Sequence, residues 1–135
     1  MHPRLRPLFP GACVCAVLLT IAGFRIMAAD TPAKPLVHNV YFSLKDPSPA
    51  NIDALKNACH KYLDGHDGLL YFGAGPLVEE LNRPVNQRDF HISLCTVFKD
   101  KAAHDQYQTH PRHLQFIAEN KETWEKVRVF DSWAK

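Results

Sequence analysis

The residues best suited to chemistry lie in one short stretch, Tyr107-Gln108-Thr109-His110-Pro111-Arg112-His113. Tyr107, His110 and His113 are spaced three apart, close to one helical turn. His113 shares a helical face with Phe116 and Ile117, which directs its imidazole toward the apolar interior. An imidazole with a pKa near about 6.5 is a natural general base, and a phenol can orient or polarise a carbonyl. The stretch therefore predicts His113 and Tyr107 as catalytic residues, whereas His110, at a proline boundary, is expected to cap a helix junction.

A small-molecule pocket is expected where these helices meet the inward face of a sheet. His38 lies on the inward face of the first strand, and a buried imidazole needs a polar partner. The predicted substrate-binding residues combine that imidazole with an apolar wall: they are His38, Phe42, Leu94, Phe116 and Trp124. The competing interpretation is that the inward histidines are structural and are satisfied by hydrogen bonds within the core.

Neither a metal nor a cofactor is expected from the spacing of the ligand-type residues. His38, His110 and His113 could in principle meet at an ion, but no carboxylate or cysteine completes the set by sequence spacing. The chain has no Cys-x-x-Cys and no His-Glu-x-x-His motif. The glycines of residues 73–76 run into a proline and a polar loop, which favours a turn or bulge over a phosphate cradle.

The elements that must position these residues follow from apolar periodicity and from proline and glycine punctuation. Alternation predicts strands, and spacing of three or four with Ser48-Pro49, Asp100 and Pro111 at the starts predicts helices. The expected order is strand 36–44, helix from 49 to a stop near Gly65, strand 69–72, an irregular loop through Asn86, strand 90–98, a helix from 101 restarted at 111, and strand 127–133. This order predicts an α+β fold, a ferredoxin-like split βαβ with a four-stranded antiparallel sheet and helices on one face.

The second face of that sheet would remain uncovered. Its residues mix apolar and polar side chains: Val37, Asn39, Tyr41, Ser93, Cys95 and Val97. A domain of about 100 residues has little core of its own, so a homodimer with the sheets face to face is expected. Cys59 is predicted on the helix side and Cys95 on the open face. This arrangement argues against an intrachain disulfide and leaves a bond between two Cys95 side chains across the dimer open.

The net charge and the leader suggest where the protein is located. The 135 residues carry 16 Lys and Arg against 14 Asp and Glu, but residues 1–29 hold three arginines and no acid. The remaining 13 basic and 14 acidic residues give a charge of −1, which disfavours nucleic acid and anionic membrane surfaces as partners. A basic start, an apolar run from Ala12 to Phe24 and Met27-Ala28-Ala29 predict a signal peptide over residues 1–29.

The predicted domain organisation is therefore a signal peptide (1–29), an extended lead-in (30–35) and one domain (36–133). The protein is expected to be exported to the periplasm or the extracellular space, with no other membrane contact. An uncleaved N-terminal membrane anchor is the alternative, because Arg25 interrupts the apolar run.

From Val37 to Asp131 the sequence resembles the stress-responsive A/B barrel (Dabb) domain family. The motifs that carry the resemblance are Val37-His38-Asn39-Val40, Gly73, Asp89, Phe98-Lys99-Asp100, Tyr107 with His110-Pro111-Arg112-His113, and Val129-Phe130-Asp131. The resemblance implies a dimeric α/β barrel built from two ferredoxin-like sheets.

Within that family the site is similar to that of polyketide cyclases of the olivetolic acid cyclase type. The resemblance implies that His113 is the catalytic histidine, that Tyr107 is the catalytic tyrosine, and that His38 and the indole of Trp124 lie at the same cavity. The leading hypothesis is an exported homodimer that binds a small apolar carbonyl or phenolic ligand, with cofactor-independent, cyclase-like proton transfer if it is an enzyme. The alternatives are a non-catalytic, stress-related binding or structural module and a metal- or haem-binding dimeric barrel.

Overall fold

The computed structural model describes residues 34–134 of the chain. The elements, in chain order, are β1 (Leu36–Leu44), α1 (Pro49–Leu63), β2 (Leu69–Pro76), β3 (Ile92–Phe98), α2 (Lys101–Thr109), α3 (Pro111–Asn120), the short 3₁₀ helix η1 (Lys121–Thr123) and β4 (Trp124–Trp133). The predicted signal peptide over 1–29, its cleavage site and most of the lead-in over 30–35 lie outside the described residues.

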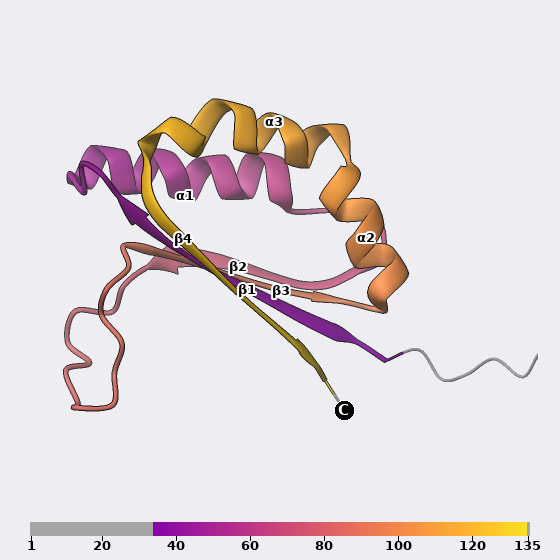
Figure 1. Cartoon of the computed structure of the whole chain (residues 1–135), viewed down its shortest axis with the longest axis horizontal. Coiled ribbons are helices and arrows are strands. Elements are labelled where there is room, and N and C mark those ends of the chain that lie inside the picture. The colour runs from indigo at the N-terminus through magenta and orange to yellow at the C-terminus, as the bar shows by residue number, and fades with distance from the viewer. Residues whose placement is uncertain (1–33, 135) are drawn as a thin grey trace, which may run out of the picture.

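The four strands form one antiparallel sheet in the order β2-β3-β1-β4. The three α-helices lie together on one side of this sheet, and no helix of residues 34–134 lies on the other side (Figure 1). The predicted α+β, ferredoxin-like architecture is confirmed. Within residues 34–134 no helix has the length and apolar character needed to cross a membrane.

The alternation of β1 determines which of its residues enter the core. His38, Val40 and Phe42 are buried under the helices, whereas the residues between them are only partly buried. Cys59 is buried on α1 and Cys95 is half-buried on the far face of the sheet, and both are free thiols. The expectation that these two cysteines do not pair is therefore confirmed.

Local sequence signals explain where the helices begin. Pro49 occupies the first turn of α1. The Asp100 carboxylate accepts the backbone N–H of Ala103 at 2.7 Å, which caps α2. His110 ends α2, and its Nδ1 accepts the backbone N–H of Arg112 at 3.1 Å to cap α3. The predicted capping role of His110 is thus confirmed.

Three strand boundaries differ from the expected ones. β2 does not stop at residue 72 but continues to Pro76, with Gly73 and Gly75 opposite Cys95 and Ser93. The hydrogen bonds between β2 and β3 join backbone groups, so this edge strand tolerates glycines. The shift in register between the two strands lies earlier, between Leu69 and Tyr71. β3 begins at residue 92 rather than 90, and β4 begins at residue 124 rather than 127 because η1 delivers the chain directly to the sheet.

Candidate functional site

A cavity of about 370 Å³ lies between the inner face of the sheet and helices α2 and α3. All seven residues predicted for the site line it: His38, Phe42, Leu94, Tyr107, His113, Phe116 and Trp124. The other lining residues are Val40, His104, Gln108, Ile117, Val127, Val129 and Asp131. The volume falls within the range of about 300–1,000 Å³ that is usual for small-molecule sites.

His113 is held as a neutral imidazole with one nitrogen free. The residue is 8% exposed, and its Nδ1 lies 3.1 Å from the carbonyl oxygen of Gln108. Because a carbonyl only accepts, Nδ1 carries a proton, and in the neutral ring Nε2 then keeps its lone pair. Burial lowers the pKa of His113 below its ordinary value, and the hydrogen bond to Gln108 only partly opposes this effect. The residue is therefore an unprotonated base at neutral pH.

Tyr107 lies beside His113, with 4.5 Å between the ring centroids. The tyrosine is 2% exposed, and its hydroxyl makes no hydrogen bond within residues 34–134, where the fully buried side-chain polar atoms without a partner are Trp124 Nε1 and Arg128 Nε. Burial raises the pKa of Tyr107, and the nearby Cys59 thiol adds to the effect. The phenol thus stays protonated and can donate a hydrogen bond to an acceptor in the cavity.

His38 is paired with a carboxylate across the sheet. Its Nδ1 donates to Oδ1 of Asp131 at 2.7 Å, where β1 and β4 bring the two residues directly opposite each other. Burial lowers the pKa of His38, and the hydrogen bond and charge of Asp131 oppose that shift without cancelling it. The hydroxyl of Thr96 donates to the backbone carbonyl of His38 at 3.0 Å, which fixes this point of the strand.

Three polar residues of the cavity, His104, Gln108 and Asp131, were missed by sequence reasoning. His104 lies one helical turn before Tyr107, and its ring centroid is 5.0 Å from that of His38. Asp131 lies two positions after Val129 on the last strand and shares its face of the sheet. Helical spacing could have placed His104, and strand alternation Asp131, on the inward faces of their elements. The sequence did not indicate that they would meet at His38.

The remaining wall of the cavity is aromatic and aliphatic. The Phe42 ring lies 5.2 Å from Trp124 and 6.1 Å from Phe116, centroid to centroid. The indole Nε1 of Trp124 is buried and has no hydrogen-bond partner among residues 34–134. The site therefore combines an apolar wall with imidazole and phenol groups concentrated on one side.

Metal-type ligands gather in a different set from the one considered from the sequence. His38, His104 and Asp131 have donor atoms that all lie within 4.8 Å of one another. His110 is not part of the cavity, because it caps α3 and its ring packs against His66 at 4.6 Å.

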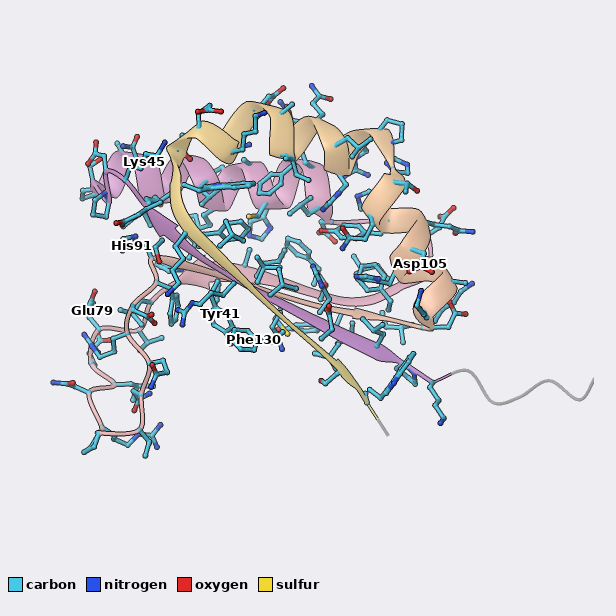
Figure 2. All side chains as sticks on the ribbon, in the orientation of Figure 1. Tyr41, Lys45, Glu79, His91, Asp105 and Phe130 are labelled. Carbon is cyan, nitrogen blue, oxygen red and sulfur yellow. The ribbon has the colours of Figure 1, made fainter. Side chains whose placement is uncertain are left out.

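A second hollow of about 380 Å³ lies on the opposite face of the sheet, between the strands and the loop that joins β2 to β3. Figure 2 shows Tyr41 and Phe130 on this side, away from the helices, and their ring centroids are 5.7 Å apart. Arg128 donates to the Asp89 carboxylate at 2.6 Å and so holds the loop against the sheet. This face mixes aromatic and polar side chains, and no helix of residues 34–134 covers it.

The fold and cavity define a ferredoxin-like α+β protein with a histidine-rich pocket beneath its helices. The sequence model of the stress responsive A/B barrel domain (Dabb) family matches residues 36–134. The chain belongs to this family. No curated protein sequence matches it.

Solved structures share the fold at low sequence identity. A Dabb family protein with a ferredoxin-like fold from Mesorhizobium loti is 24% identical, with a TM-score of 0.63 over 76% of this chain and 98% of that one. A dimeric ferredoxin-like protein of unknown function from Thermobifida fusca is 14% identical, with a TM-score of 0.64 over 76% and 92% of the two chains. The hydroxynitrile lyase from Passiflora edulis is 20% identical, with a TM-score of 0.62 over 77% and 95%.

Proposed function

We propose that the cavity binds a small, largely apolar carbonyl or phenolic compound and that His113 and Tyr107 act on it as base and orienting acid. The observation that carries the proposal is the pairing of an unprotonated, buried imidazole with a phenol that lacks a protein partner. A purely structural tyrosine in a core normally finds a hydrogen-bond partner for its hydroxyl. The aromatic wall formed by Phe42, Phe116 and Trp124 suits an aryl ring.

The chemistry follows from these two groups. Nε2 of His113 accepts the proton of an activated methylene next to a carbonyl. The electron pair of the broken C–H bond forms a carbon–carbon double bond. The π pair of the carbonyl moves onto its oxygen, which accepts a hydrogen bond from the Tyr107 hydroxyl. The resulting enolate can regain a proton or attack an internal carbonyl, as in a cyclisation. One protein of this fold is itself named a lyase, the Passiflora edulis hydroxynitrile lyase.

Deuterium exchange tests this function. Deoxybenzoin, an aryl ketone with an activated methylene, is incubated with the protein in D₂O, and its deuterium content is followed by mass spectrometry. The wild type is expected to accelerate exchange, and His113→Gln is expected to abolish the acceleration. Leu114→Ala is the matched control, because Leu114 lies next to His113 on the exposed side of α3.

Each result decides between the candidate functions. Mass spectrometry of small molecules that co-purify with the protein, together with a binding titration of deoxybenzoin, accompanies the exchange assay. Binding without exchange would assign the pocket to a non-catalytic module. If His113→Gln altered neither binding nor exchange while its circular dichroism stayed native, the site assignment would be wrong.

We also propose that the bare face of the sheet forms a homodimer. Tyr41 and the exposed Phe130 pack against each other on this face, and the Thermobifida fusca protein of the same fold is described as dimeric. Phe130→Asp is expected to convert a dimer to a monomer in light scattering, because it places an unpaired charge in the proposed interface. Leu114→Asp, a similar change on the helix side, is expected to remain dimeric. A monomeric wild type would refute this proposal.

Finally, we propose that the protein is exported to the periplasm or the extracellular space after cleavage behind Ala29. The support is the basic, apolar and small-residue pattern of residues 1–29. The intact mass of protein recovered from the native host is expected to correspond to a chain that begins at Asp30. A full-length chain in the membrane fraction would instead indicate an uncleaved anchor.

A further inference from the structure

We propose that His38, His104 and Asp131 form a binding site for a divalent transition-metal ion at the side of the cavity. The three residues come from three different elements, β1, α2 and β4, and all three line the cavity. Each offers one donor atom, and these atoms lie within 4.8 Å of one another. The proposal does not rest on the function proposed above, because metal binding can be measured without any organic ligand.

The geometry is close to that of a coordination sphere. Ligand atoms about 2.1 Å from an ion lie roughly 3.0–3.5 Å from each other in tetrahedral or octahedral sites. The His38 Nδ1 and Asp131 Oδ1 atoms are 2.7 Å apart, and one donor atom from each of the three residues lies within 4.8 Å of the other two. Small rotations of side chains therefore suffice to admit an ion between them.

The donor set indicates the class of ion. Two imidazoles and one carboxylate suit zinc, cobalt and iron, whereas calcium and magnesium prefer sites made of oxygen ligands alone. Three protein ligands also leave coordination positions open, as in catalytic rather than structural metal sites. In this site the open positions would be taken by water or by an oxygen of a ligand in the cavity.

The surroundings hold the ligands and provide a path for entry. The Gln108 amide lies 3.0 Å from Nε2 of His104, and the Thr96 hydroxyl anchors the backbone of His38. The side chain of Asp131 is 49% exposed, whereas that of His38 is 6% exposed. An ion can thus reach the carboxylate from solvent and be drawn onto the buried imidazole.

Cobalt provides a direct test. Protein without a histidine tag is titrated with Co²⁺, and visible absorption reports the d–d bands of protein-bound cobalt. Zinc is then added to displace it. The wild type is expected to bind one ion per chain, and His104→Ala and Asp131→Asn are expected to weaken binding by about tenfold or more. His60→Ala, which removes an exposed imidazole from α1, is the matched control and is expected to bind like the wild type.

Thermal unfolding with and without zinc tests each variant against its own metal-free midpoint, so a less stable variant can still be assessed. Zinc is expected to raise the thermal unfolding midpoint of the wild type and of His60→Ala. It is expected to leave the midpoints of His104→Ala and Asp131→Asn unchanged. Absence of cobalt bands in the wild type would overturn the proposal. Equal binding by the wild type and by both folded cluster variants would overturn it as well.

Discussion

Replacing Tyr107 with phenylalanine removes one oxygen atom from the cavity and leaves the packing of the ring in place. The ring contacts His66 and Phe98 at centroid distances of 4.9 Å and His113 at 4.5 Å, and phenylalanine can keep all three contacts. The hydroxyl has no hydrogen-bond partner within residues 34–134, so the folded state loses no internal bond. The free energy of unfolding is therefore expected to change by less than about 0.5 kcal/mol.

Tyr62 provides the matched comparison within the same core. Its hydroxyl accepts from Lys61 Nζ and donates to the Glu119 carboxylate, both at 2.6 Å. Tyr62→Phe removes both bonds and is expected to lower the free energy of unfolding by about 1 kcal/mol. The two substitutions delete the same atom type, so the difference between them measures whether the Tyr107 hydroxyl is structural or is reserved for a ligand.

Urea denaturation at one fixed protomer concentration measures both changes, since a dimer would make stability concentration-dependent. A ligand that accepts a hydrogen bond from Tyr107 should bind the Tyr107→Phe variant about tenfold more weakly, which corresponds to about 1.4 kcal/mol. If Tyr107→Phe were as destabilising as Tyr62→Phe, the hydroxyl would have a structural partner and the reasoning would be refuted.

Substitutions at four positions test the fold and its protonation. Gly68 has φ +78°, and an added Cβ would lie 2.6 Å from that of Ala103, so Gly68→Ala is expected to destabilise by about 1–3 kcal/mol in urea denaturation. Gly65→Ala, at φ +68° with open space, should cost about 1–2 kcal/mol and less than Gly68→Ala. Asp100→Ala removes the cap of α2 and is expected to cost about 1 kcal/mol, whereas Asp100→Asn should largely retain it. Burial lowers the pKa of His113 below its unfolded value. As the pH falls, the unfolded chain therefore takes up a proton at this histidine at a higher pH than the folded chain does. Stability should therefore fall as the pH drops below about 6.5, and His113→Gln should reduce this dependence in pH-resolved melting curves.

Much of the cavity was predictable because local periodicity assigns a residue to a face. Alternation along β1 placed His38 and Phe42 inward, and helical spacing along α3 placed His113 and Phe116 inward. These assignments need no knowledge of the partner element, since a strand or helix has a fixed angular repeat. The extension of β2 through Gly73 was not predictable in this way, because its ladder depends on backbone pairing with β3.

The sequence by itself determined the order of the elements and the burial of the His38 and His113 imidazoles. It also determined that Cys59 and Cys95 lie on different sides of the sheet and do not pair. Only the tertiary structure decided which polar groups meet. The contact between His38 and Asp131 spans 93 positions and exists because β1 and β4 pair in one register. A shift of one residue would turn Asp131 to the other face of the sheet. Pattern alone can assign a face, but contacts between distant elements depend on the sheet register and helix packing that folding selects.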